Sequence, residues 1–103
     1  MRKLLSSEAL ATALAGVAAW AHHPDRDSIS RTYQFPSFAE AIRFVNAIAE
    51  VATEIDHHPD IDIRYNKVRL EVTTHSARGL TRLDFVLASR AEELADDLEM
   101  KEG

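Results

Sequence analysis

The chain has 103 residues, 46% of them hydrophobic but only 7% aromatic, which predicts one domain over residues 1–103 with a largely aliphatic core. It contains no cysteine, which excludes disulfides, thiolate metal sites and cysteine nucleophiles and is compatible with the cytoplasmic location that we expect. The formal net charge is -5, concentrated in residues 91–103. No basic stripe is present to neutralise phosphates, so we expect no direct nucleic-acid partner.

The first 21 residues combine two basic residues with an apolar stretch, as a signal peptide does, but they fit a helix better. The polar run Ser6–Glu8 interrupts the continuous apolar core that a secretory signal needs. A serine of this run can cap a helix, Glu8 then faces the positive helix end, and Gly16 provides a stop. The segment is too short and too rich in small residues to span a bilayer, so we expect no membrane partner.

A pair of short strands is predicted next. Residues 17–21, which include Trp20, are predicted as a strand, and residues 22–27 as a turn. Residues 28–35 alternate between apolar and polar side chains, which indicates a half-buried strand paired with the preceding one. Its predicted core face holds Ile29, Tyr33 and Phe35, interrupted by Arg31, and its predicted solvent face holds Ser28, Ser30, Thr32 and Gln34.

A helix is predicted over residues 38–54. Ser37 precedes it as an N-cap, and Glu40 stands three residues later to complete a capping box. Pro59 disfavours helical geometry at His58 and so marks the exit of the chain. A stripe at helical spacing predicts the buried face, made of Phe38, Ala41, Ile42, Val45, Ile48, Ala49 and Ala52.

Two further strands are predicted beyond this helix. In residues 60–65 apolar and charged side chains alternate, and Asn66 then marks a tight turn. In the next strand, the predicted polar face holds Lys67, Arg69, Glu71 and Thr73. It also includes His75 if the strand continues that far without a bulge. Its predicted core face holds Val68, Leu70 and Val72.

The last predicted helix follows a loop at residues 76–79. Thr81 is its cap, and Asp84 stands at the position that reaches back. The resulting order is α-β-β-α-β-β-α, and the helices can bury their stripes only on one face of a four-stranded antiparallel sheet. We therefore expect an α+β fold, a two-layer α/β sandwich. The apolar stripe of the last helix comprises Leu80, Leu83, Leu87, Ala91, Leu94 and Leu98.

Residues 56–84 hold the candidate chemistry. His57, His58 and His75 lie at turns and element ends there, together with Asp56 and Asp84. The unperturbed pKa of histidine lies near working pH, so such a cluster suits proton transfer, with a carboxylate to fix tautomer and orientation. The same residues also fit structural roles, the histidines at a helix end and Asp84 in a capped first turn. Residue types alone leave both interpretations open.

Other chemistries fit the sequence less well. Adjacent histidines such as His57 and His58 rarely both face one ion from a regular element, and no His-Glu-x-x-His pattern is present. A serine triad lacks its Gly-x-Ser-x-Gly elbow. The aspartates at positions 56, 60, 62 and 84 lack the aromatic sugar platform and large cleft of a glycoside hydrolase. Proton transfer without a metal is the best match.

Four motifs carry a resemblance to a known family. They are His57-His58-Pro59 after a helix, Tyr65-Asn66-Lys67 at a strand start, Thr74-His75 at a strand end, and Gly79-Leu80-Thr81-Arg82-Leu83-Asp84 entering the last helix. In this order and at these spacings they resemble the pterin-4a-carbinolamine dehydratase family. The resemblance covers nearly the whole chain, because Trp20, Ile29, Arg31, Phe35, Phe38 and Phe44 also match its N-terminal half.

The resemblance implies an enzyme, a hydro-lyase. It would remove water from 4a-hydroxytetrahydrobiopterin, the pterin-4a-carbinolamine, to give quinonoid dihydropterin. This step recycles the tetrahydropterin cofactor of aromatic amino-acid hydroxylases. The resemblance further implies a small α+β domain assembled as a homodimer or homotetramer, a pterin as substrate, and no metal or organic cofactor.

The resemblance also assigns the site. The catalytic residues it implies are His57, His58, His75 and Asp84, and the substrate-binding residues are Asp56, His58, Pro59, Thr73, Thr74 and His75. We hypothesise that His57 and His75 are the general acid and base, and that His58 mainly holds the pterin. Asp84 would orient an imidazole or the ring edge.

The chain departs from the family pattern at one place. The family usually has an acidic residue four positions before the first active histidine, where this chain has Thr53. Glu54 follows one residue later, about 100° further around a helix, so it need not replace the missing carboxylate. Asp56 could compensate. A second His-His-Pro run, at residues 22–24, lies where the family has no catalytic residues, and we interpret it as a turn.

A non-catalytic binding module is the alternative function. Relatives of this fold serve as a dimerisation cofactor of a transcription factor or as a Rubisco assembly factor that has lost active-site residues. This chain keeps all three histidines and Asp84, which favours catalysis.

Overall fold

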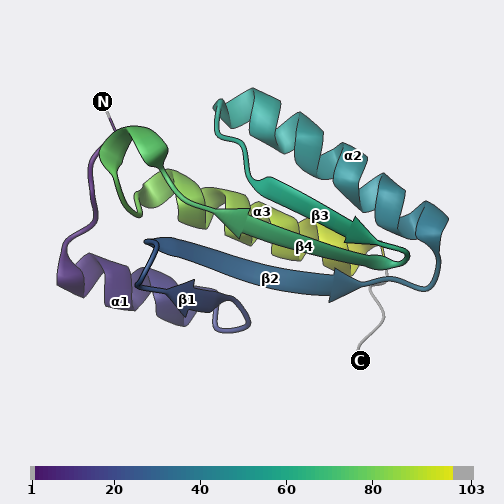
Figure 1. Cartoon of the computed structure of the whole chain (residues 1–103), viewed down its shortest axis with the longest axis horizontal. Helices are drawn as coiled ribbons and strands as arrows, with labels where there is room; N and C mark the ends of the chain where they lie inside the picture. The colour runs from purple at the N-terminus through teal and green to yellow at the C-terminus, as the bar shows by residue number, and fades with distance from the viewer. Residues whose placement is uncertain (1, 99–103) are drawn as a thin grey trace.

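The computed structural model describes residues 2–98, and the chain follows the predicted α-β-β-α-β-β-α order with one added 3-10 turn (Figure 1). The four strands form an antiparallel sheet in the order β1-β2-β4-β3. Part of the acidic segment at residues 91–103 lies outside the described residues. The elements are α1 (Ser7–Gly16), β1 (Ala21–His23), β2 (Ser28–Gln34), α2 (Phe38–Ile55), β3 (Asp60–Arg64), β4 (Lys67–Val72), η1 (His75–Ala77) and α3 (Arg82–Asp97).

The helices cover one face of the sheet. α2 and α3 pack against each other and, with the core faces of β2 and β4, enclose the apolar interior. In Figure 1, α3 passes behind the sheet and α1 lies beside β1 at one edge, where its apolar residues pack against the same core. This arrangement confirms the predicted α+β sandwich.

The first hairpin differs from the prediction. β1 is Ala21–His23, so the strand predicted at residues 17–21 is wrong, and His22 and His23 lie in a strand instead of the turn. Val17 and Trp20 are buried in the turn that follows α1, where the Trp20 amide donates to the Val17 carbonyl at 2.9 Å. Their apolar side chains fill the core from a turn, which the hydrophobic pattern alone cannot distinguish from a strand.

The solvent face predicted for β2 is partly covered. Ser28 and Ser30 are buried, and both side chains bond to residues of the neighbouring strands. The Ser28 hydroxyl donates to Glu71 at 2.6 Å, and the Ser30 hydroxyl lies 2.7 Å from Nε2 of His23. The predicted core face of the strand is confirmed, with Ile29, Tyr33 and Phe35 fully buried.

The buried stripe of α2 is rotated from the prediction. Ala41, Ile48 and Ala52 are buried as predicted. Phe44 and Val51 are buried as well, whereas Phe38 is 50% exposed and Ala49 is exposed. The ring centroid of Phe44 lies 4.9 Å from those of both Tyr33 and Phe35. This aromatic cluster, formed by residues far apart in the sequence, sets which face of the helix turns inward.

The helix caps are predicted well. Ser6 caps α1, which ends at Gly16 as predicted, and Thr81 with Asp84 forms the complete capping box of α3. Ser37 caps α2 by accepting from the Glu40 amide at 3.2 Å. The Glu40 carboxylate, however, pairs with Arg43 at 2.7 Å. Only half of the capping box predicted for α2 is therefore present.

The face of α3 that packs on the sheet is broader than predicted. Phe85, Ala88 and Ala95 are buried in addition to Leu87 and Ala91. Leu80, at the start of the predicted stripe, is also buried. Three other predicted leucines are only partly buried, namely Leu83, Leu94 and Leu98. The small residues on this face allow α3 to approach α2 closely.

A polar cluster on Glu92 explains the arginine on the core face of β2. The Trp20 indole and the Tyr33 hydroxyl each donate to Oε1 of Glu92 at 2.8 Å, and Arg31 donates to the same carboxylate. Burial alone would raise the pKa of Glu92, but the hydrogen bonds from Arg31 and Tyr33 hold that pKa below its ordinary value. Burial raises the pKa of Tyr33 strongly, and the bond to Glu92 adds to this. The cluster fastens the chain after α1, β2 and α3 together.

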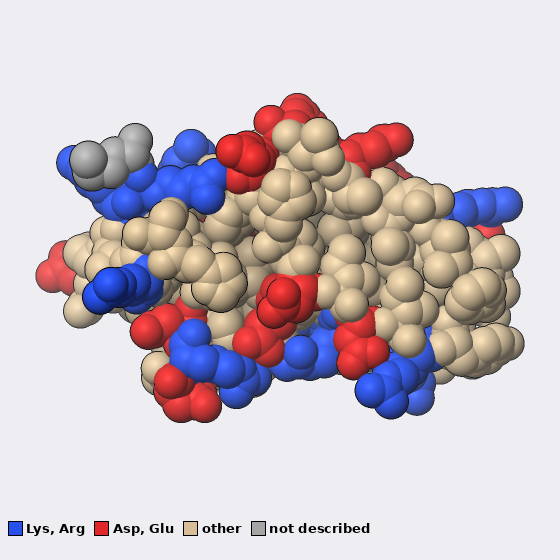
Figure 2. Space-filling view, turned by 45° about the horizontal axis from the view of Figure 1, so that its top comes forward, with Lys and Arg blue, Asp and Glu red and all other residues tan. Residues whose placement is uncertain are grey.

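The surface carries charges of both signs. On the face in Figure 2, acidic and basic side chains are interspersed along the lower edge and a broad neutral band crosses the middle. None of the described helices has the length and apolarity that a membrane crossing requires.

Candidate active site

The end of α2 sends two adjacent histidines in different directions. Asp56 caps the helix in the left-handed conformation, with φ 52° and ψ 49°, and its amide bonds the Ala52 and Thr53 carbonyls. Aspartate tolerates this conformation better than most residues. The reversal buries His57, which is 4% exposed, and leaves His58 exposed.

His57 belongs to a buried polar network with Asp84. Nε2 of His57 lies 2.6 Å from Oδ1 of Asp84, where an imidazole N–H donates to the carboxylate, and Asp84 is 0% exposed. Oδ2 of Asp84 accepts from the Thr74 hydroxyl at 2.9 Å and from the Thr81 amide at 2.8 Å. The hydroxyls of Thr74 and Thr81 lie 2.8 Å apart. The network joins the ends of α2 and β4 to the start of α3.

A hollow of about 170 Å³ brings the other two histidines together. β4 ends at Val72, so His75 does not continue the strand as predicted but begins η1, and from there it faces the same hollow as His58. The volume is below the roughly 300–1,000 Å³ typical of drug-sized ligands, which suits a small flat ring that stays partly exposed. The full lining is Arg26, Ser28, His58, Asp60, Glu71, Thr73 and His75.

One wall of the hollow is an ionised carboxylate held by donors. Arg26 donates to both oxygens of Glu71, from Nε at 2.8 Å and from Nη2 at 3.1 Å. Ser28 and Arg69 add bonds at 2.6 and 2.7 Å. The hydrogen bond from Arg26, helped by those from Ser28 and Arg69, outweighs burial and holds the pKa of the Glu71 carboxyl well below its usual range.

Of the remaining expected substrate-binding residues, only Thr73 lines this hollow. The Thr73 side chain lines it and donates to the Asp27 carbonyl at 2.6 Å. Pro59 is half-buried between His58 and β3. The Asp56 side chain is 90% exposed, and its nearest cation is Arg2, at 3.9 Å.

The acids that could compensate for Thr53 do not line the hollow. The Thr53 hydroxyl donates back to the Ala49 carbonyl at 2.9 Å. Glu54 faces α3, where its carboxylate lies 3.8 Å from Arg90. The rotation of about 100° between these neighbours on a helix therefore directs Glu54 away from the histidines.

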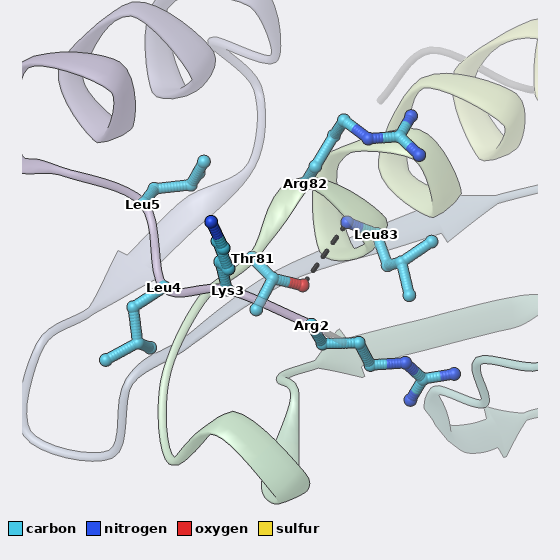
Figure 3. A pocket seen from close by; sticks show the side chains of 7 residues that line it. All are labelled: Arg2, Lys3, Leu4, Leu5, Thr81, Arg82 and Leu83. Atoms are coloured by element: carbon cyan, nitrogen blue, oxygen red, sulfur yellow. Dashed lines mark hydrogen bonds between the residues drawn. The ribbon is translucent and has the colours of Figure 1, made fainter.

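A second hollow, of about 360 Å³, lies beside the start of α3 (Figure 3). Residues 2–5 run along it, with the Leu5 amide bonded to the Leu80 carbonyl at 3.1 Å. Figure 3 shows the Thr81 hydroxyl accepting from the Leu83 amide, at 3.3 Å. Among the described residues, no histidine or acid lines this hollow, which is formed by Arg2, Lys3, Leu4, Leu5, Thr81, Arg82 and Leu83. It lacks groups that exchange protons near neutral pH, so the smaller hollow is the candidate active site.

Sequence reasoning missed four of the residues in the smaller hollow. Arg26 and Ser28 were expected in a turn and on a solvated face, and Asp60 and Glu71 on the wet faces of strands. The register of β3 against β4 places Asp60 opposite Glu71, while Arg26 and Ser28 reach the same hollow from the β1–β2 turn and the first residue of β2. The signal available was that Glu71, Thr73 and His75 share one predicted strand face. Among residues 2–98, no group of three or more His, Asp or Glu side chains has a metal-binding arrangement.

Comparisons with known proteins identify close relatives. The family model described as "Pterin 4 alpha carbinolamine dehydratase" matches residues 3–94. A protein of Thermomicrobium roseum is 46% identical over 91 residues, which cover 88% of this chain and 96% of the relative. One of Nocardia farcinica is 48% identical over 93 residues, with 90% and 96% covered. Both carry the name "Putative pterin-4-alpha-carbinolamine dehydratase".

Two solved structures share the fold. A transcriptional coactivator/pterin dehydratase from Brucella melitensis superimposes with a TM-score of 0.84 at 32% identity, covering 88% of this chain and 97% of that one. A pterin dehydratase-like protein, a RuBisCO assembly factor in the α-carboxysome, has a TM-score of 0.66 at 20% identity, with 75% and 89% covered. The second comparison concerns the fold alone.

Proposed function

The chain belongs to the pterin 4 alpha carbinolamine dehydratase family, and from this premise we propose that it removes water from 4a-hydroxytetrahydrobiopterin. The product is quinonoid dihydropterin, so the enzyme recycles the tetrahydropterin cofactor of aromatic amino-acid hydroxylases. The observation that carries the proposal is the convergence of His58 and His75 on one hollow, next to the buried His57–Asp84 pair.

The reaction requires two proton transfers. The C4a–O bond breaks as the hydroxyl takes up a proton and leaves as water. N5 gives up its proton, and its electron pair forms the C4a=N5 double bond. Imidazoles interconvert between neutral and protonated forms near pH 7, so one can donate while another accepts. No electron transfer occurs, and the proposed reaction uses no metal or organic cofactor.

We assign the direct proton transfers to His58 and His75. Both are exposed and line the hollow. His57 was expected to act directly, but its ring is buried and bonded to Asp84, which supports a positioning role for this pair instead. In this role the bond between His57 and Asp84 fixes the backbone that precedes His58. It also holds the start of α3 against the loop after α2. Pro59, Thr73 and Thr74 shape the hollow around the substrate, and Asp56 holds the turn before His57.

A dehydratase assay tests the proposal. The substrate is produced by an aromatic amino-acid hydroxylase, and its decay is followed by absorbance with and without the purified chain. The expected result is an acceleration proportional to enzyme concentration. It should fall by about 10²–10⁴-fold in His75→Ala, because a general acid–base group contributes about that factor. A folded wild-type chain without acceleration would overturn the proposal.

A binding module is the second candidate. The two solved neighbours are described as a transcriptional coactivator/pterin dehydratase and as a RuBisCO assembly factor, so partners other than a pterin occur with this fold. The same assay separates the two functions, since a module would fold and assemble without turnover. The exposed histidines in the hollow favour the enzyme, because a module has no need of them.

We further propose a cytoplasmic homodimer or homotetramer without a nucleic-acid or membrane partner. Phe38 on α2 and Ile61 and Ile63 on the edge strand β3 are large apolar side chains left exposed in the single chain. Their contact with a second copy would remove apolar surface from water. The mixed surface charge in Figure 2 supports the expectation that phosphate backbones are not the partner.

A further inference from the structure

Some side chains that line the hollow already make hydrogen bonds or ion pairs within the protein, and others do not. Arg26 and Ser28 bond Glu71, and Thr73 donates to a backbone carbonyl. Among residues 2–98, no hydrogen bond or ion pair reaches the other three lining side chains, which are His58, Asp60 and His75. The unbonded three are available to a ligand.

The position of Asp60 is unfavourable for the protein alone. Asp60 begins β3 and stands opposite Glu71 in the β-ladder. Side chains so paired have Cβ atoms about 4.5–5.5 Å apart, and like charges there destabilise the sheet. Two arginines neutralise Glu71, but within the described part of the chain no cation is bonded to Asp60. Features that cost stability in this way are expected at functional sites.

A pterin offers the complementary chemistry. Its pyrimidine edge presents two adjacent donors, N3–H and the 2-amino group, which a carboxylate can accept in parallel. Glu71 already accepts four hydrogen bonds, which fill about four lone-pair positions. Glu54 and Asp56 do not line the hollow. Asp60 is the lining carboxylate with free oxygens.

We propose that Asp60 is a specificity-determining residue that binds the N3–H and 2-amino edge of the pterin ring, an inference that rests on the proposed function. C2 and C4a lie at opposite corners of the pyrimidine ring. Holding the ring by its 2-amino edge therefore leaves the reacting C4a–N5 bond to the two histidines. Because Asp60 is fixed on a strand, it also defines which way round the ring enters.

The test combines a substitution with a change in the ring. Asp60→Asn removes the charge and one acceptor with little change in shape. We expect KM for the carbinolamine to rise about 10- to 100-fold, the loss of a charge-assisted pair, while kcat changes less than about threefold. Binding of 7,8-dihydrobiopterin, followed by fluorescence, should weaken by a similar factor. The wild-type protein should bind 7,8-dihydrobiopterin more tightly than a dihydrolumazine, which has a 2-oxo group in place of the 2-amino group. Asp60→Asn should bind the two compounds with similar affinity.

Asp62→Asn is the matched control. Asp62 lies two residues along β3, pairs with Arg64 at 3.0 Å, and does not line the hollow, so its substitution should leave KM and ring preference unchanged. Equal KM and ring preference in wild type and Asp60→Asn would overturn the inference while leaving the dehydratase in place. A wild type that neither turns over the carbinolamine nor binds dihydrobiopterin would instead reject the proposed function. Melting temperatures show whether either variant is destabilised.

Discussion

Asp84 combines two roles in one buried side chain. One carboxylate oxygen accepts a hydrogen bond from the His57 imidazole, and the other accepts one from the Thr81 amide at the start of α3. The capping role is predictable from sequence, because Thr81 and Asp84 form a local motif. The bond to His57 is not, since 27 residues separate the pair and only the packing of α2 against α3 joins them. For the same reason sequence reasoning could not tell which of two adjacent histidines is buried.

The different settings of His57 and His75 lead to different responses to substitution. His57→Gln keeps a donor near Asp84, so it should retain more kcat and more stability than His57→Ala, which leaves Asp84 short of a partner at a cost of about 1–3 kcal/mol. At His75, which exchanges protons in the proposed mechanism, Gln and Ala should lower kcat equally, by about 10²–10⁴-fold. Kinetics and urea unfolding measure both effects. His22→Ala, outside the hollow, is the control, and equal losses in His57→Gln and His57→Ala would reject the positioning role.

At the scale of elements, local signals predicted most boundaries and long-range contacts decided the rest. The alternation in β2 and β4 and the caps Ser37 and Thr81 correctly placed the strands and helices. The phase of α2 was mispredicted because Phe44 packs between Tyr33 and Phe35, a contact that no local pattern encodes.

The half-formed capping box of α2 predicts unequal effects at its two positions. Ser37→Ala should destabilise the protein by about 1 kcal/mol, because the Glu40 amide loses its acceptor. Glu40→Gln should change stability by less than about 0.5 kcal/mol, because its carboxylate makes only an exposed pair with Arg43. Thermal or urea unfolding of the two variants compares them. A larger loss in Glu40→Gln would mean that the Glu40 carboxylate contributes more than an exposed ion pair.

The ion pair between Glu71 on β4 and Arg26 in the β1–β2 turn predicts that the stability of the protein falls in acid. The folded-state pKa of Glu71 lies below its ordinary value of 4.5, so as pH falls the unfolded chain takes up this proton first. The stability that Glu71 contributes is present above pH 4.5 and is lost as pH falls through the folded-state pKa. Glu71→Gln should therefore be less stable than wild type at neutral pH, and the difference should narrow in acid. Urea unfolding at several pH values measures this, and a difference that widens toward low pH would contradict it.

At the scale of the whole molecule, the fold class followed from the order of the elements, but the hollow did not. Its lining comes from the β1–β2 turn, from β2, β3, β4 and η1, and from the loops after α2 and β4, so it exists only once the sheet is assembled. Resemblance to a family located the histidines, whereas it gave no indication of Arg26, Asp60 or Glu71.

The free edge of the sheet predicts how copies assemble. Ile61 and Ile63 lie exposed on β3, and an edge strand with apolar side chains is a template for pairing with another chain. Ile63→Lys should shift the protein toward smaller species, since lysine on an edge strand discourages such pairing. Sedimentation velocity measures the change, with Ser89→Lys on α3 as control. A wild type that sediments as a monomer would rule out the proposed homo-oligomer.

His57 and Asp84 form a buried pair, whereas the imidazoles of His58 and His75 are exposed. This difference decides which residues reveal a loss of activity in related proteins of this fold. Within residues 2–98 no hydrogen bond or ion pair holds the His58 and His75 side chains, so both can be replaced without breaking one. Replacing Asp84, in contrast, removes half of the capping box of α3 and leaves the His57 ring without its partner. We therefore expect that a related protein without catalytic activity can lose the two exposed histidines and still keep the buried His57–Asp84 pair, because the pair stabilises the fold. The presence of Asp84 then indicates only that the fold is kept, and the presence of His58 and His75 indicates catalytic activity.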